Sequence, residues 1–160
     1  MPYIHHPLIR AAALALLLHA SIAVAQTVRP TDPVALGRYL VQTTGCNDCH
    51  TARYGELAGK VPEAEWLTGD ALGFRGPWGT SYPTNLRLFA AGMTRAQWLQ
   101  HARSMQPRPP MPWFNLRAMS DDDLGAIHAY LKAAGAAGQP APAYVPPGQL
   151  PKPPFIQWPQ

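Results

Sequence analysis

Cys46, Cys49 and His50 form the one cluster of reactive side chains in the sequence, within the stretch GCNDCHTAR, and no other cysteine is present. Two thiols separated by two residues lie on adjacent helical turns. There they can form thioether bonds to the two vinyl groups of a haem, and the next residue's imidazole can bind the iron. The spacing therefore predicts one covalently attached haem c per chain, with Cys46 and Cys49 binding the cofactor and His50 binding the metal.

Three other kinds of site use paired cysteines. A structural zinc site usually has four ligands, and the sequence offers no second cysteine or histidine pair with suitable spacing. A thioredoxin-like redox site lies in a βαβ unit, and no such pattern surrounds Cys46. A simple disulfide would not need His50. Zinc or thiol chemistry would give a colourless protein, whereas haem gives a coloured one.

A second axial ligand must come from another part of the chain. Met111 lies in RPPMPWF, where Pro110 and Pro112 keep the backbone extended and stiff. A thioether on a rigid loop suits a fixed iron–sulfur bond, so we expect Met111 to be the second metal ligand. Met105 and His101 are the main alternatives. The further methionines and histidine of the mature region have simpler explanations in helix packing: Met93, Met119 and His128.

Iron held by both His50 and Met111 has no free position for a substrate or for oxygen. The expected function is transfer of single electrons between redox partners, and the protein would not be an enzyme. A thioether ligand and burial of the haem both favour a relatively high reduction potential. There are two alternatives: a dedicated electron-transfer subunit of a membrane oxidoreductase, or a haem enzyme or gas sensor in which Met111 does not bind and the sixth position is open.

Four segments carry helix signals, and no alternating strand pattern accompanies them. Asp32 and Pro33 start one helix, and Thr94 and Gln97 have capping-box spacing in another. The sequence therefore predicts an all-α domain of about four short helices wrapped around one haem, which would fill an otherwise thin core. The helical segments are 31–45, 61–69, 93–105 and 119–135.

The two ends of the chain differ from the middle. Residues 1–25 have Arg10, the apolar run AAALALLL and Ala25 at a cleavage position, as in an export signal. We expect a periplasmic protein with a haem domain over 26–135. Residues 136–160 are proline-rich and predict an extended tail that packs on the domain or docks a partner. Membrane contact would come only through a partner or an uncleaved leader.

The charge pattern excludes one class of partner. The formal net charge is +4, and the arginines and lysines are scattered singly along the chain. A nucleic-acid surface needs clustered basic residues, which are absent here. We therefore expect protein partners and no nucleic acid.

Three stretches resemble class I c-type cytochromes: GRYLVQTTGCNDCH, PPMPW and MSDDDLGAIHAYLKAAG. The resemblance implies that the first and last helices cross, with Gly37 and Tyr130 at the contact. The longer stretch MPWFNLRAMSDDDLGAIHAYL is similar to cytochrome subunits of membrane-bound alcohol and aldehyde dehydrogenases. Those subunits commonly carry several haems, whereas this chain is monohaem by its single motif. The resemblance implies a dehydrogenase or oxidase complex as redox partner.

The resemblance also implies a segment beneath the haem propionates. The stretch FRGPWGTSYPTN occupies that place, so its polar side chains are candidate donors to the propionates: Arg75, Trp78, Tyr82 and Asn85. Simple loop packing is the alternative for Trp78 and Tyr82.

Overall fold

A computed structural model describes residues 29–159 of the protein. The expected export signal lies outside these residues. The described elements are α2 (Pro33–Thr43), α3 (Cys46–His50), the 3₁₀ turn η1 (Glu63–Glu65), β1 (Gly73–Gly76), β2 (Gly79–Ser81), α4 (Leu86–Ala91), α5 (Arg95–Ser104), α6 (Trp113–Ala118), α7 (Asp121–Ala134) and β3 (Phe155–Gln157).

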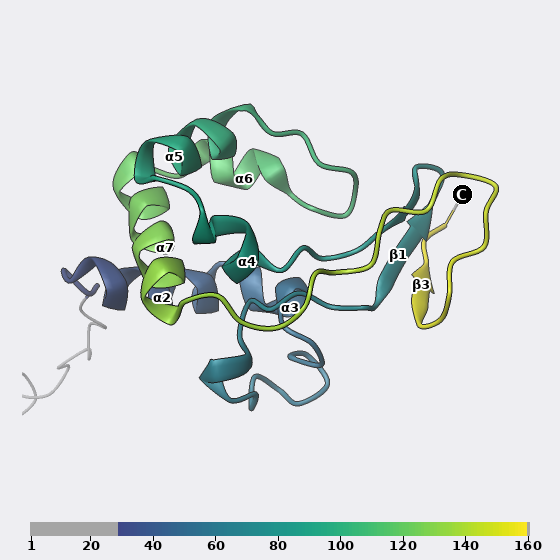
Figure 1. Ribbon diagram of the computed structural model, residues 1–160, viewed down its shortest axis with the longest axis horizontal. Coiled ribbons are helices and arrows are strands. Elements are labelled where there is room, and N and C mark those ends of the chain that lie inside the picture. The colour runs from purple at the N-terminus through teal and green to yellow at the C-terminus, as the bar shows by residue number, and fades with distance from the viewer. Residues whose placement is uncertain (1–28, 160) are drawn as a thin grey trace, which may run out of the picture.

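Helices α2 and α7 lie against each other at one side of the helical body (Figure 1). Gly37 of α2 lies against α7, where a Cβ atom would come within 2.0 Å of the Ala126 carbonyl oxygen and 2.7 Å of the Tyr130 Cβ. Only glycine allows the backbones to approach this closely. Gly37 and Tyr130 thus meet as the resemblance implied. The fully buried side chains around this contact include Val41, Leu124 and Leu131.

Local capping signals start the longer helices. The Asp32 side chain accepts the backbone N–H of Ala35 at 2.8 Å, which caps α2. Thr94 and Gln97 form a complete capping box at the start of α5, as their spacing predicted. Ser120 caps α7. These caps fix the helix ends that position the loops between them.

The expectation of an all-α fold was wrong in part. The chain is mostly helical, but a three-stranded sheet with the order β2-β1-β3 is also present. Residues 61–69 form only the single turn η1, and α4 and α6 were not expected as helices. Each strand has only three or four residues, too few to show an alternating pattern.

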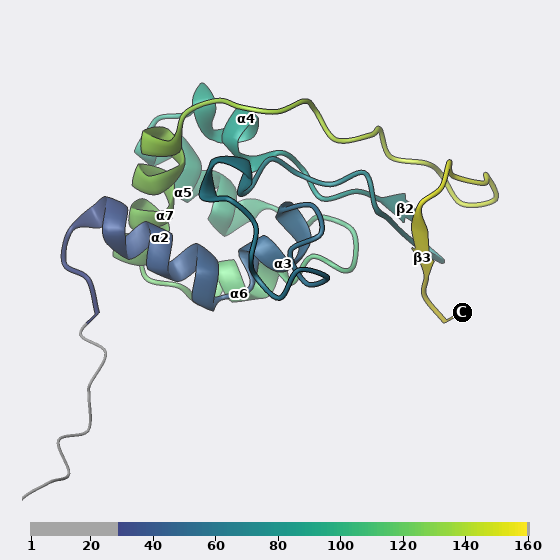
Figure 2. The ribbon, with the colours of Figure 1, turned by 90° about the horizontal axis from the view of Figure 1, so that it is seen from below.

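The proline-rich tail folds back along β1 and β2. Thr80 and Val145 exchange two backbone hydrogen bonds, of 2.8 and 3.1 Å. Strand β3 then pairs in parallel with β1, with Phe74 opposite Ile156. Together 72–82 and 143–159 make a β-lobe that projects from the helical body (Figures 1 and 2). Two distant parts of the sequence therefore build one small unit.

The start of the tail is fixed to the body by Arg87 of α4. This arginine is 7% exposed, and its guanidinium donates to the carbonyl oxygens of Ala64 and Gly135, each at 2.6 Å, and to that of Ala134. The carbonyls at the end of a helix carry partial negative charge, which suits a cation. Arg87 thus joins the end of α7 to the segment around η1.

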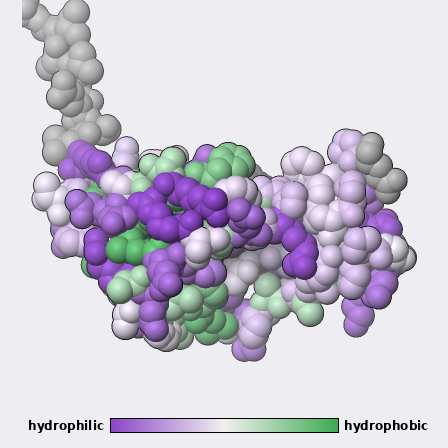
Figure 3. Space-filling view, turned by 90° about the horizontal axis from the view of Figure 1, so that it is seen from above, coloured by the Kyte–Doolittle hydropathy of each residue, from purple (hydrophilic) through white to green (hydrophobic). Residues whose placement is uncertain are grey.

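The surface of the two units differs. In Figure 3, strongly hydrophilic and strongly hydrophobic patches alternate over the helical body, whereas the β-lobe is mostly pale. The β-lobe contains Arg75 and Lys152 but no acidic residue.

Within the described part of the chain, none of the helices has the length and apolar character that a bilayer crossing requires.

Candidate functional site

Helix α3 brings Cys46, Cys49 and His50 together in a single five-residue segment. His50 is 9% exposed, and its Nδ1 lies 2.7 Å from the carbonyl oxygen of Thr84. A carbonyl only accepts hydrogen bonds, so Nδ1 carries the proton and donates it. Burial lowers the pKa of His50, which keeps the ring neutral. The unprotonated Nε2 has no hydrogen-bond partner among residues 29–159, so its lone pair is free for a metal ion.

The backbone around His50 is fixed as well as its ring. The N–H of Gly69 donates to the His50 carbonyl oxygen at 2.8 Å. Gly69 has a φ of +83°, and a Cβ there would lie 2.9 Å from the Pro83 carbonyl oxygen and from the Asn85 nitrogen. Glycine is needed at this position for both reasons. Gly69, which precedes β1, therefore fixes His50 at its carbonyl, and Thr84, in the segment before α4, fixes its ring.

Cys46 and Cys49 are free and half-buried. Burial is the main cause that raises the pKa of each thiol, and nearby Asp48 raises both further. A dithiol that works in redox exchange needs a lowered pKa, because the thiolate is the reactive form. The surroundings of these thiols therefore do not favour thiol-redox chemistry.

The donor set also bears on the zinc alternative. Within the described residues, no group of three or more His, Cys, Asp or Glu side chains is placed to hold a metal ion. A closed zinc site needs four such ligands. Two thiols and one imidazole with a free nitrogen instead fit a haem that is attached covalently and bound through its iron.

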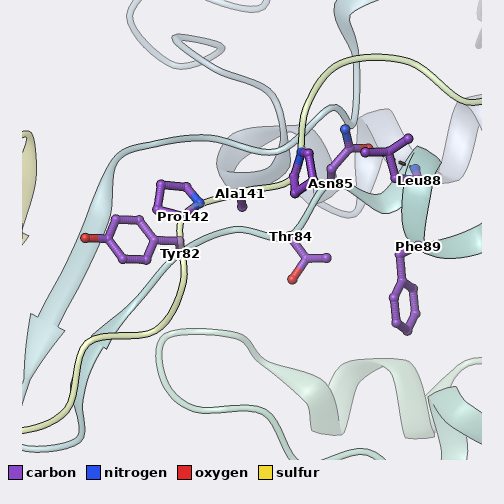
Figure 4. A pocket seen from close by; sticks show the side chains of 8 residues that line it. Tyr82, Thr84, Asn85, Leu88, Phe89, Ala141 and Pro142 are labelled. Carbon is purple, nitrogen blue, oxygen red and sulfur yellow. Dashed lines mark hydrogen bonds between the residues drawn. The ribbon is translucent and has the colours of Figure 1, made fainter.

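A cavity of about 360 Å³ lies beside Thr84. Tyr82, Thr84 and Phe89 line it from the segment that leads into α4 and from α4 itself, and Pro140 and Pro142 line it from the tail. Figure 4 shows the side chains of Thr84 and Phe89 pointing toward α6 and the loop before it. The segment that orients His50 thus also forms a wall of this cavity.

Met111 lies half-buried on the loop before α6. Its carbonyl oxygen accepts the N–H of Trp113 at 2.9 Å. The loop is held to the β-lobe, because the Ser81 hydroxyl donates to the Pro109 carbonyl oxygen at 2.5 Å and Arg108 stacks on Tyr144 at 3.6 Å. The loop that carries Met111 is therefore tied at its N-terminal side.

The other candidate ligands have structural contacts. His128 is 7% exposed, and its Nε2 lies 3.0 Å from the Met93 carbonyl oxygen, so this nitrogen carries the proton and donates it. The ring of His101 packs on Phe89, with centroids 4.9 Å apart. Met105 caps the end of α5. Of the three histidine rings described, only that of His50 combines a fixed Nδ1–H with a free Nε2.

The candidate propionate donors are mostly engaged elsewhere. The Asn85 amide donates to tail carbonyls and is 1% exposed. Arg75 donates to the Gln157 side chain at 3.1 Å, and the Trp78 indole donates to the Phe74 carbonyl oxygen at 3.3 Å. In this structure these three side chains donate to partners within the protein, and their role toward the propionates stays a prediction. Tyr82 lines the cavity.

A model of the cytochrome c family matches residues 34–135. The chain belongs to the cytochrome c family. Members of the family transfer electrons through haem, and this cytochrome binds covalent haem c, one in its domain, with Cys46 and Cys49 in the attachment spacing. Neither the curated proteins nor the solved structures gave a significant match to the chain.

Two residues of the site were not found from the sequence. Thr84 acts through its backbone carbonyl, so its side-chain type carries no signal for the contact with His50. Gly69 was expected only as the end of the helical segment 61–69, whereas its N–H fixes the His50 carbonyl. A glycine can mark a close backbone approach, but the partner cannot be named from the sequence.

Proposed function

We propose that this cytochrome carries single electrons between redox proteins in the periplasm, with His50 and Met111 as the two axial ligands. The free Nε2 of His50, set by the hydrogen bond from Nδ1 to Thr84, is the observation that carries the proposal. Haem supplies reversible one-electron chemistry when it is bound. With both axial positions taken by side chains, this cytochrome has no site for a substrate, and it is not an enzyme.

The protein residues have three tasks in this proposal. Cys46 and Cys49 hold the cofactor through thioether bonds. Thr84 fixes the tautomer and direction of the His50 ring, which makes Nε2 a stronger donor to iron. The loop around Met111, stiffened by its neighbouring prolines and held by Ser81, presents a thioether that favours the reduced state.

Features of the sequence support the proposed compartment and partners. The export signal expected over residues 1–25 supports the periplasm, where haem c is attached. The similarity of the stretch MPWFNLRAMSDDDLGAIHAYL to subunits of alcohol and aldehyde dehydrogenases supports a membrane dehydrogenase as electron donor. The scattered arginines support short encounters with an acidic partner surface.

The visible absorption spectrum tests the axial ligands. Wild type, exported in a host that attaches haem c, should show a low-spin spectrum with the far-red band of a sulfur–iron(III) bond. Met111→Ala should lose that band and keep the covalent haem, because Cys46, Cys49 and His50 remain. Met105→Ala is the matched control and should keep the band. If wild type lacks the band, the proposed ligation is wrong.

The β-lobe favours a second candidate, a dedicated electron-transfer subunit of a membrane oxidoreductase. Leu150 is 74% exposed and Ile156 46% exposed, and the lobe carries positive charge without acidic residues. Exposed apolar side chains on such a surface suit a lasting contact with an acidic protein face. A complex that persists through gel filtration and dissociates with Leu150→Ser would favour the subunit over a free carrier.

A further inference from the structure

Asn85 makes three side-chain hydrogen bonds and is 1% exposed. Its Oδ1 accepts the N–H of Leu88 at 3.0 Å, which caps α4. Its Nδ2 donates to the carbonyl oxygens of Ala137 at 2.8 Å and Gln139 at 3.1 Å. One buried amide therefore joins the start of α4 to the beginning of the tail.

The tail residues next to these carbonyls reach the cavity that Thr84 lines. Pro140, Ala141 and Pro142 line that cavity together with Thr84 and Phe89. Figure 4 shows Asn85 adjacent to Thr84, with Ala141 and Pro142 on the tail segment that passes alongside. Backbone carbonyls that lose a buried donor must bind water instead. Loss of the Asn85 hydrogen bonds would therefore release the tail around residues 137–142.

Packing at Gly138 supports the same contact from the tail side. Gly138 has a φ of +74°, and a Cβ there would lie 3.1 Å from the Asn85 Nδ2 and 3.1 Å from the Thr68 Cβ. Any side chain at this position would be strained and would press on the Asn85 amide. The tail backbone between Ala137 and Gln139 is thus shaped to meet Asn85.

We infer that Asn85 is a positioning residue that holds residues 137–142 as a wall of the cavity that Thr84 lines, and so raises the reduction potential. The inference rests on the proposed function, because it takes this cavity, which Thr84 connects to the His50 ring, as part of the haem surroundings. Water that enters such a cavity stabilises the more charged oxidised state. A seated tail excludes this water and favours the reduced state.

Two variants of the full-length protein test the inference from opposite sides. Asn85→Ser keeps a good capping oxygen for α4 but loses the amide group that donates to both tail carbonyls. Gly138→Ala leaves Asn85 intact and displaces the tail. Both should speed proteolytic cleavage of the native protein between residues 136 and 142. Both should also shift the reduction equilibrium three- to tenfold toward the oxidised form, tenfold being about 59 mV for one electron.

A control separates this effect from general loss of stability. Thr94→Ala removes the cap of α5 without touching the tail, so it should lower stability and leave the potential and the cleavage of the tail unchanged. If the tail is cleaved faster in both variants while the potential stays within twofold, the inference is overturned. It is also overturned if neither variant speeds the cleavage. A failure of the proposed function would appear separately, as a wild-type spectrum without His and Met ligation.

Discussion

The helical body and the β-lobe are held together in different ways. In the body, α2 and α7 pack through fully buried side chains, and caps on each long helix fix its start. In the β-lobe, backbone hydrogen bonds such as those between Thr80 and Val145 join segments whose large side chains are mostly partly exposed. Apolar burial supplies most folding free energy, so the body should set the stability and the lobe should open more easily.

The contact of α2 with α7 should be the most sensitive point of the molecule. Gly37→Val places a branched side chain where the Ala126 carbonyl oxygen lies 2.0 Å from the Cβ position. We expect a loss of at least about 2 kcal/mol in the free energy of unfolding, since the backbones must separate. Urea denaturation followed by circular dichroism measures this loss.

Gly55→Val is the matched control for that variant. No atom lies within 4 Å of a Cβ at Gly55, so the change should cost less than about 0.5 kcal/mol. Equal losses in the two variants would show that the close helix contact is not the source of the stability.

Tyr130 should add a smaller and pH-dependent contribution to the body. Its hydroxyl donates to the Glu63 Oε1 at 3.0 Å, and burial followed by this contact raises the pKa of Tyr130 above its ordinary value of 10.0. A raised pKa in the folded state stabilises the protein below pH 10.0, and this contribution is lost as the pH rises further. Tyr130→Phe should cost about 1 kcal/mol near neutral pH.

Denaturation of both proteins over a range of pH tests the assignment. The stability gap between wild type and Tyr130→Phe should narrow once the pH exceeds the ordinary pKa of tyrosine, since only wild type has this group to ionise. A gap that stays constant to strongly alkaline pH would mean that the pKa of Tyr130 is not raised in the folded state.

The β-lobe should show the smallest effect on overall stability. Trp158 is 40% exposed, and its ring centroid lies 6.1 Å from that of Trp78. Its backbone N–H donates to the Arg75 carbonyl oxygen. Trp158→Ala should change the free energy of unfolding by less than about 1 kcal/mol and still speed hydrogen exchange in β3. A large cooperative loss would show that lobe and body unfold as one unit.

The same contrast explains which parts of the fold could be predicted. The capping pairs Asp32–Ala35 and Thr94–Gln97 act over three residues, so the starts of α2 and α5 are visible in the sequence. The pairing of β1 with β3 brings together residues 82 positions apart, as between Arg75 and Gln157. Strands this short carry no pattern of their own, and their partners are set only by the folded chain.

The residues of the site also differ in whether the sequence could reveal them. Cys46, Cys49 and His50 are adjacent in the sequence, so local spacing was enough to single them out. Thr84 orients His50 from 34 positions away through a backbone atom, which no residue type reveals. Asn85 was identified as a candidate for the propionates, but the tail that binds its amide is distant in the sequence. In both cases the contact joins residues that are far apart in the sequence, so the sequence alone could not show it.

Exposure of the reduced protein to carbon monoxide shows whether His50 and Met111 together leave an open position at the iron. The visible spectrum should stay unchanged after the gas is added at neutral pH, because both axial positions are taken by side chains. A rapid shift to the spectrum of a carbon monoxide complex would show that Met111 does not hold the iron, and would identify the protein as a haem enzyme or gas sensor with an open sixth position.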